Sequence, residues 1–160
     1  MSWSLINGDV GPTYIDMKTL DILLVSDDRT ACAWFGMAVE RTGLNIRLQT
    51  VTDGEQAIDY LEGRGDYAAR FIHPVPDLVI LDLDSQLAGG LFFLSWLRAS
   101  ASRSFLPVVI LSTFAYKGAL ATVFAMGNNT LITAPFELEG WKTVVQQIWN
   151  LAMERHEAIA

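Results

Sequence analysis

DLVILDLD, residues 77–84, is the stretch that decides the fold of this chain. After its first residue, the segment from Asp77 to Leu81 is apolar throughout, which is typical of a strand buried on both faces of a parallel sheet. Asp82 ends this run and Asp84 follows two residues later. A second run of the same kind, Ile22 to Val25, is also followed by carboxylates. Both runs therefore predict buried strands that end in acidic residues.

Strands and helices alternate along the rest of the chain. The expected strands are Ile22–Val25, Asn45–Val51, Asp77–Leu81, Val108–Leu111 and Thr130–Thr133. The expected helices are Arg29–Thr42, Asp53–Glu62 with Asp53 as N-cap, Gly89–Ala99, Ala115–Met126 and Glu137–Glu154. Strands that are separated by single helices must run parallel, with right-handed crossovers. We therefore expect an α/β fold, a doubly wound (βα)5 domain whose five-stranded parallel sheet has helices on both faces.

Composition and charge narrow the class of protein. The formal net charge of -7 argues against binding to nucleic acid or to an anionic membrane surface. Cys32 is the single cysteine, no signal peptide is visible, and no apolar run is long enough to span a membrane, so we expect a cytoplasmic protein. Residues 1–16 show no clear period and are expected to be an N-terminal extension or an added segment. The domain is expected over residues 17–155, with no output domain after it.

Carboxylates and hydroxyls follow the strands at the edge where an open parallel sheet places its sites. Like charges at close range recruit a cation, and hard oxygen ligands of this kind suit Mg²⁺. An Asp beside such an ion can attack phosphorus, and a nearby hydroxyl can then donate a hydrogen bond to the phosphoryl oxygens. The expected metal ligands are Asp27, Asp28, Asp82 and Asp84, and the expected hydroxyl is that of Ser112.

Four stretches carry a resemblance to a known family. DILLVSDD (21–28), DLVILDLD (77–84) and PVVILST (107–113) together resemble the response-regulator receiver domains of two-component signalling, the CheY-like superfamily. VTDGEQAIDYLEGRGDYA (51–68) is similar to the single-domain regulators associated with bacterial phytochromes. The resemblance covers nearly the whole chain and implies a flavodoxin-like sheet with strand order 2-1-3-4-5.

The resemblance also assigns roles to single residues. It implies that Asp82 accepts a phosphoryl group from a sensor histidine kinase, such as one of the phytochrome type. It implies that Asp27 and Asp28 help to hold Mg²⁺ and that Ser112 moves onto the phosphoryl group. The chain is then a phosphorelay component and not an enzyme, beyond its own phosphoryl acceptance and autodephosphorylation.

The switch region, which comprises Thr113, Leu131, Ala134 and Pro135, departs from the family pattern. The family has a lysine before a cis proline, whereas this chain has Ala134 before Pro135. A lost charge-assisted hydrogen bond of this kind is worth about 1.5–3 kcal/mol. The aromatic switch position is Leu131, and Asp84 stands where Asn is common. We nevertheless expect the bond between Ala134 and Pro135 to be cis, because the family's matching bond is cis.

Two other functions fit the same residues. One is a pseudo-receiver, an interaction module that keeps the fold but signals without phosphorylation. The other is a phosphatase of the haloacid-dehalogenase type, in which Asp82 and Asp84 would form an Asp-x-Asp pair, although such enzymes place this pair on the first strand and use a later lysine. A mass shift at Asp82 after incubation with acetyl phosphate and Mg²⁺ would separate these functions.

The output of a chain without a second domain would be a protein contact. The family's usual partner face is formed by the fourth and fifth helices and the strand between them. Here that face is expected to carry Tyr116, Leu120, Val123, Phe124, Leu131, Phe136, Trp141 and Trp149. A helix that is apolar nearly all round is unfavourable in water, and two-fold symmetric contacts are the commonest assembly. We therefore expect a homodimer through this face, which also serves a downstream protein.

Overall fold

The computed structural model describes residues 18–113, 125 and 127–159. Its elements, in chain order, are β1 (Leu20–Val25), α2 (Arg29–Thr42), β2 (Ile46–Val51), α3 (Gly54–Glu62), the short 3-10 helix η2 (Gly65–Tyr67), β3 (Leu78–Asp82), α4 (Leu87–Ala99), β4 (Val108–Ser112), β5 (Asn129–Thr133) and α6 (Leu138–Ile159). The segment 1–16 and nearly all of the helix expected over 115–126 lie outside the described residues. Within the described ranges, no helix combines the length and the apolar character that crossing a membrane requires.

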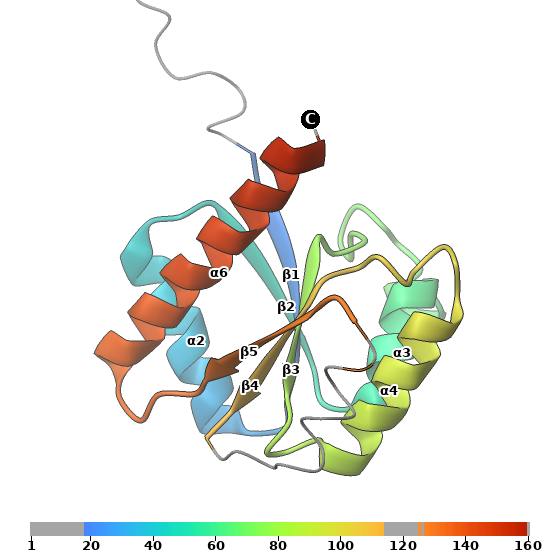
Figure 1. Cartoon of the computed structure of the whole chain (residues 1–160), viewed down its shortest axis with the longest axis horizontal. Helices are drawn as coiled ribbons and strands as arrows, with labels where there is room; N and C mark the ends of the chain where they lie inside the picture. Colours follow the sequence, from blue (N-terminus) through green and yellow to red (C-terminus); the bar gives the residue numbers. More distant parts are fainter. Residues whose placement is uncertain (1–17, 114–124, 126, 160) are drawn as a thin grey trace, which may run out of the picture.

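The five strands form one parallel sheet in the order β2-β1-β3-β4-β5, which confirms the expected fold (Figure 1). Val25 at the end of β1 pairs with Val51 of β2 on one side and with Leu81 of β3 on the other. Asp82 at the end of β3 pairs with Leu111 of β4. The carboxyl ends of β1, β3 and β4 therefore lie together at the middle of one sheet edge.

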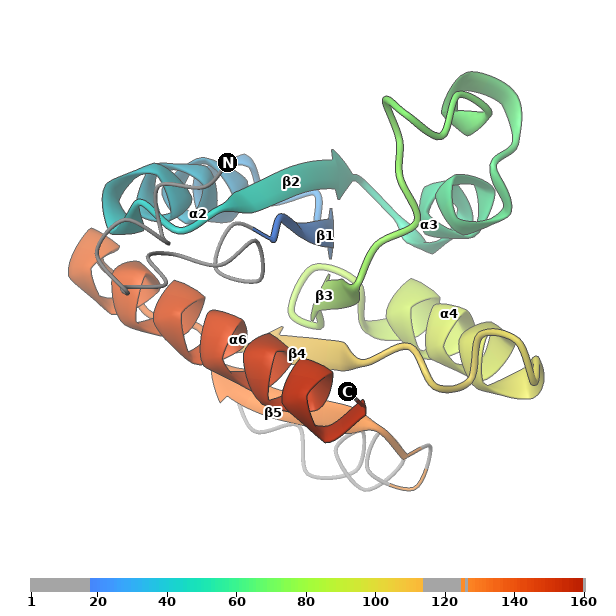
Figure 2. The same cartoon turned by 90° about the horizontal axis from the view of Figure 1, so that it is seen from above.

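Each face of the sheet has its own core. Helices α2 and α6 cover one face, and α3 and α4 cover the other (Figure 2). Alternate residues of β3 illustrate the division, because Ile80 packs with the α2 and α6 side chains while Leu81 packs with those of α3 and α4. The strands β3 and β4 are buried at every position, as their uninterrupted apolar runs predict. The edge strands β2 and β5 keep exposed positions.

The helix after β3 begins earlier than the sequence suggests. It starts at Leu87, whereas Gly89 and Gly90 were expected to open it. Both glycines lie instead in its first turn, where Gly90 allows close packing. A Cβ built at Gly90 would lie 3.2 Å from the Leu81 side chain, and one at Gly54 of α3 would lie 2.8 Å from the carbonyl oxygen of Gly89. Gly90 therefore allows α4 to approach the sheet, and Gly54 allows α3 to approach α4.

Tyr60 of α3 gives a testable pH dependence. Tyr60 is 1% exposed, and its hydroxyl donates a hydrogen bond to the carbonyl oxygen of Pro74 at 2.9 Å. Burial raises the pKa of this hydroxyl to about 12. The folded state therefore holds this proton more tightly than the unfolded state, whose tyrosine pKa is about 10. The stabilisation is fully present below about pH 10 and is lost as the pH rises toward 12.

The variant Tyr60→Phe isolates this effect. At neutral pH we expect it to lower the free energy of unfolding by about 1 kcal/mol, because one buried hydrogen bond is lost. Between pH 10 and 12 the wild-type chain should lose on the order of 2–3 kcal/mol that the variant does not lose. Urea unfolding across this range measures both curves. Parallel curves would show that Tyr60 does not titrate as the structure indicates.

Candidate functional site

Three buried polar residues stand at the carboxyl ends of three neighbouring strands. Ser26 follows β1, Asp82 ends β3 and Ser112 ends β4. Their exposed fractions are 2%, 8% and 4%. Because β3 lies between β1 and β4, Asp82 occupies the centre of this edge. Buried polar side chains require hydrogen-bond partners, and these partners define the site.

The carboxylate of Asp82 is held on one side and left open on the other. Its Oδ2 atom accepts a hydrogen bond from the Ser26 hydroxyl at 2.7 Å. The Ser26 oxygen in turn accepts one from the backbone N–H of Asp28 at 3.1 Å. The contact to Oδ1 is a long one, from the backbone N–H of Ser85 at 3.4 Å. Ser26 therefore fixes the orientation of Asp82 and leaves Oδ1 weakly engaged.

Asp28 is the N-cap of α2. Its Oδ1 atom accepts hydrogen bonds from the backbone N–H groups of Thr30 at 3.0 Å and Ala31 at 3.1 Å. This arrangement satisfies two of the free donors at the start of the helix and places negative charge at the positive end of its dipole. The cap also holds the Asp28 carboxylate beside the end of β1.

Asp84 accepts hydrogen bonds from residues at the end of β4. Its Oδ1 atom accepts a hydrogen bond from the Ser112 hydroxyl at 2.7 Å. Its Oδ2 atom accepts one from the Thr113 backbone N–H at 2.7 Å and one from the Thr113 hydroxyl at 2.6 Å. The Ser112 hydroxyl, which the sequence assigned to a phosphoryl group, therefore donates to Asp84 in this structure.

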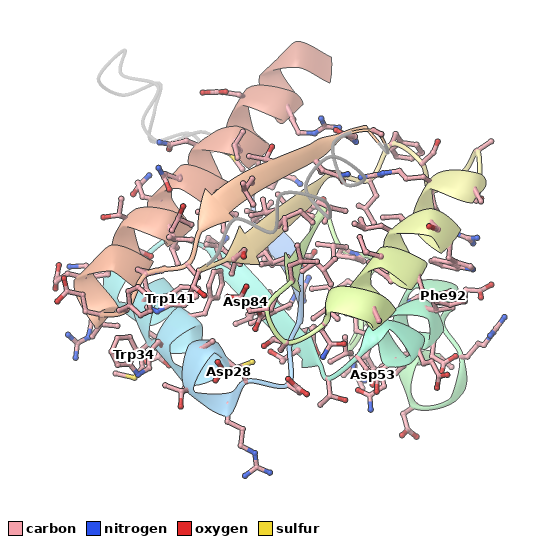
Figure 3. All side chains as sticks on the ribbon, turned by 60° about the horizontal axis from the view of Figure 1, so that its bottom comes forward. Asp28, Trp34, Asp53, Asp84, Phe92 and Trp141 are labelled. Carbon is pink, nitrogen blue, oxygen red and sulfur yellow. The ribbon has the colours of Figure 1, made fainter. Side chains whose placement is uncertain are left out.

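A pocket of about 250 Å³ joins these residues. Three of the four predicted carboxylates, Asp28, Asp82 and Asp84, line it, as does Thr113. Asp27 is exposed and is not among its lining residues. The remaining walls are mainly apolar and are formed by Ala31, Trp34, Leu111, Ala134, Pro135, Phe136 and Trp141 together with Thr30. Figure 3 shows Asp28 and Asp84 close to Trp34 and Trp141 at this end of the molecule.

The predicted four-carboxylate metal site is not assembled in this arrangement of side chains. In the part of the chain that the structure describes, no group of three or more His, Cys, Asp or Glu side chains is placed to hold an ion. Both oxygens of Asp84 receive hydrogen bonds from Ser112 and Thr113, and Asp27 lies outside the pocket. A smaller site fits better, because Mg²⁺ is commonly held by one or two carboxylates and several waters. Asp28 and Asp82 both line the pocket and suit that role.

Of the four switch residues, Thr113, Ala134 and Pro135 line the pocket and Leu131 does not. The bond between Ala134 and Pro135 is trans, so the expected cis bond is wrong. Trans is the lower-energy form for most X–Pro bonds, by about 0.5–1 kcal/mol, and the alanine supplies no side-chain anchor of the kind that a lysine would. Ala134 and Pro135 line the pocket, whereas Leu131 lies on the edge strand with 36% of its surface exposed.

Sequence reasoning missed three features of this site. Ser26 is not among the predicted site residues, although its position before two aspartates at the carboxyl end of a strand is a signal for a site residue. Sequence reasoning did not foresee that Gln86, which is 8% exposed, donates a hydrogen bond to the carbonyl oxygen of Thr52 at 2.8 Å. It also did not place Trp34 and Trp141 on the pocket wall, because they come from helices far apart in the sequence.

Three solved structures that are similar to this one are response regulators. The response regulator RPA3017 in red light signalling of R. palustris has a TM-score of 0.74 and 25% identity, covering 81% of this chain and 91% of its own. The phosphorylated cyanobacterial phytochrome response regulator RcpA has a TM-score of 0.74 and 26% identity, covering 85% and 95%. The Mn²⁺-bound form of response regulator Rcp1, at 24% identity and a TM-score of 0.69, covers 81% and 91% and shares the fold.

Two curated proteins are similar in sequence. "Probable methanogenesis regulatory protein FilR2" of Methanothrix harundinacea is 31% identical over 94% of this chain and 96% of its own length. Response regulator Rcp1 of Synechocystis is 24% identical over 83% and 88%. No family model matches the chain. The strand order, the aspartate at the end of β3 and these similarities agree, and the chain belongs to the response-regulator receiver family of two-component signalling.

Proposed function

We propose that this protein accepts a phosphoryl group on Asp82 from a sensor histidine kinase and transmits the signal through protein contacts. The observation that carries this proposal is the Asp82 carboxylate, which is buried at the centre of the sheet edge and oriented by Ser26 toward a pocket with a second carboxylate, Asp28. The chemistry of the chain is then limited to its own phosphoryl acceptance and loss.

The hydrogen bonds favour one oxygen as the nucleophile. Oδ2 of Asp82 is engaged by the Ser26 hydroxyl, whereas Oδ1 has only the long contact from Ser85. In the proposed step, Oδ1 forms a new bond to phosphorus while the bond from phosphorus to the donor's imidazole nitrogen breaks. The imidazole leaves with the electron pair, and the product is an aspartyl phosphate.

We propose Mg²⁺ as the cofactor, held by Asp28 and Asp82. A bound divalent ion would supply positive charge for the phosphoryl oxygens. The similar protein Rcp1 has been solved in a Mn²⁺-bound form, which supports divalent-ion binding as part of this proposal. Asp28 would contribute its second oxygen, because the first one caps α2.

The direct test is incubation with acetyl phosphate and Mg²⁺, followed by intact mass measurement. We expect one phosphoryl adduct on the wild-type protein and none on Asp82→Asn, because the amide cannot act as the nucleophile. Asp53→Asn is the matched control. Asp53 caps α3 by accepting a hydrogen bond from the Gln56 backbone N–H at 2.8 Å, and Asn is an equally good cap, so this variant should be labelled normally. A wild-type protein that takes up no phosphoryl group would contradict the proposal.

Mg²⁺ is expected to stabilise the folded protein. An ion at ten times its dissociation constant adds about 1.4 kcal/mol when it binds only the folded state. For a domain of this size, that gain raises the melting temperature by roughly 3–6 °C. The variant Asp28→Asn keeps a residue that can cap α2 and removes the charge, so its melting temperature should respond less to Mg²⁺. Equal shifts in both proteins would place the ion elsewhere.

The proposed kinase is of the phytochrome type, because RPA3017 is described in red light signalling and RcpA as a phytochrome response regulator. The proposed place of action is the cytoplasm.

On the proposed partner face, Phe136 is 82% exposed, whereas Trp141 is buried and Trp149 packs partly against the core. Tyr116, Leu120, Val123 and Phe124 lie outside the described residues. The homodimer and the downstream protein therefore stay predictions, which sedimentation of the unphosphorylated protein can begin to check.

One observation favours the second candidate, a pseudo-receiver. Asp84 already supplies an anion to the Ser112 hydroxyl and to Thr113, which are the groups that a phosphoryl group would otherwise attract. In that case the edge of β4 keeps one arrangement whether or not Asp82 is phosphorylated. Identical amide spectra for β4 with and without acetyl phosphate, on a protein that carries the adduct, would support this candidate.

A further inference from the structure

The pocket beside Asp82 combines two kinds of wall. It is lined by the carboxylates of Asp28, Asp82 and Asp84 and also by the aromatic side chains of Trp34 and Trp141. Its volume of about 250 Å³ is enough for a small organic group but not for a large ligand. The identity of the ligand can therefore be argued from the chemistry of these two walls.

The carboxylates of the pocket lack a cationic partner among the residues that the structure describes. The ion pairs of those residues join Lys18–Asp77, Arg47–Asp21, Arg64–Asp59, Arg64–Glu62 and Lys142–Glu139. None of these pairs involves a carboxylate of the pocket, and none of the described Lys, Arg or His side chains lines it. Hydrogen bonds from Ser26, Ser112, Thr113 and the start of α2 offset part of this negative charge, and the rest favours a cation that enters the pocket.

The aromatic wall selects the kind of cation. Trp141 is 4% exposed and is fixed by an edge-on contact with Phe35, whose ring centre lies 6.0 Å away. Trp34 comes from α2 and lies close to Trp141, as Figure 3 shows. Phe136 lines the same pocket and is 82% exposed. Aromatic faces attract ammonium groups and bury alkyl chains, so this wall suits an organic cation that carries an alkyl chain.

We propose that this pocket binds an alkylammonium group. The ammonium head lies between the carboxylates of Asp82 and Asp84, where it can donate up to three hydrogen bonds. The alkyl chain runs along Trp34 and Trp141 toward the exposed rim at Phe136. This binding does not depend on phosphoryl acceptance by Asp82. The group belongs either to a free amine or to a lysine side chain of a partner protein, since both present the same chemistry.

The test is a titration of the ¹⁵N-labelled full chain at low ionic strength, without Mg²⁺, with n-butylammonium chloride as the probe. We expect saturable shifts at the indole N–H groups of Trp34 and Trp141 and at the backbone of Asp84. Neutral n-butanol has the same number of heavy atoms as the probe but no charge, and it should give no saturable shift. Sodium chloride at equal ionic strength controls for screening. Shifts of equal size at the backbone N–H groups of Asp and Glu residues all over the surface would overturn the proposal.

Three variants sharpen this result. Asp84→Asn should weaken butylammonium binding about tenfold, and Trp34→Leu should weaken it while preserving the apolar surface. Asp53→Asn, which removes a carboxylate away from the pocket, should leave the affinity unchanged. Thermal melts establish that each variant is folded. An unchanged affinity in both Asp84→Asn and Trp34→Leu would contradict the assignment of the pocket.

Two further arms identify the source of the ammonium group. Nα-acetyl-lysine methylamide carries the same head on a peptide backbone, so binding at least as tight as that of butylammonium assigns the pocket to a partner's lysine. Binding of butylammonium alone assigns it to a free amine. Lys117 lies outside the described residues, and the variant Lys117→Met decides whether it competes. Saturable binding that is seen only in this variant would overturn an external ligand.

Discussion

Replacing Asp84 with asparagine is expected to raise the rate at which acetyl phosphate labels Asp82 by about tenfold, which corresponds to about 1.4 kcal/mol. Acetyl phosphate is an anion, and it must enter a pocket to which Asp84 adds a negative charge. The repulsion between these charges slows the labelling of Asp82. The amide oxygen of asparagine can still accept a hydrogen bond from Ser112 or Thr113, so the variant removes charge while keeping part of the local geometry. Intact mass measured over time gives the two rates.

Matched variants separate charge from geometry at this position. Asp84→Ala removes both the charge and the acceptor, so Ser112 loses its 2.7 Å partner and the gain in rate should be smaller than in Asp84→Asn. Asp53→Asn removes a charge far from Asp84, as Figure 3 shows, and should not change the rate. If Asp84→Asn is labelled no faster than the wild-type protein, the charge of Asp84 is not a barrier to the donor.

Replacing Arg98 with methionine is expected to lower the free energy of unfolding by about 3 kcal/mol. Arg98 of α4 donates hydrogen bonds to the carbonyl oxygens of Ser104 and Leu106, both at 2.7 Å. It also donates to the carbonyl oxygen of Asn128 at 3.1 Å and to Oδ1 of Asn129 at 2.6 Å. Burial lowers its pKa, and the nearby charge of Arg155 lowers it further. One side chain thus ties α4 to the starts of β4 and β5.

The conservative variant tests whether the fork shape of the guanidinium matters. Arg98→Lys keeps a positive charge, but a single ammonium cannot reach all four acceptors, so about 2 kcal/mol of the loss should remain. Arg64→Met removes an exposed guanidinium that pairs with Asp59 and Glu62 and should cost less than 1 kcal/mol. Urea unfolding measures each variant. Arg98→Met with wild-type stability would show that water satisfies these carbonyls equally well.

The architecture was predictable because the apolar runs of the central strands indicate that both faces of the sheet are buried. The runs at Ile22–Val25 and Val108–Leu111 have no polar residue, and only a strand with helices on both faces buries such a run completely. The start of α4 was less predictable. Gly89 and Gly90 indicated a boundary, yet the close approaches that require glycine are those of Gly90 to Leu81 of β3 and of Gly54 of α3 to the Gly89 backbone, which depend on contacts distant in sequence.

The site was predictable at the level of the sheet edge but not of its hydrogen bonds. Parallel topology alone brings Asp28, Asp82 and Asp84 to one pocket. Which carboxylate receives the Ser112 hydroxyl depends on side-chain rotamers, and the structure selects Asp84 where the sequence suggested a phosphoryl group. The cis bond before Pro135 was inferred from the family, whose lysine this chain lacks, and that inference failed.

The separate cores on the two faces of the sheet have a consequence for how this sequence can evolve. Neighbouring residues of β3 pack against different helices, because Ile80 faces α2 and α6 while Leu81 faces α3 and α4. A change of volume at Ile80 can be compensated at Phe35 or Val145, but not at Phe93, which lies on the opposite face. The residues of each central strand that face one core therefore drift independently of those that face the other, and covariation among relatives should divide along the plane of the sheet.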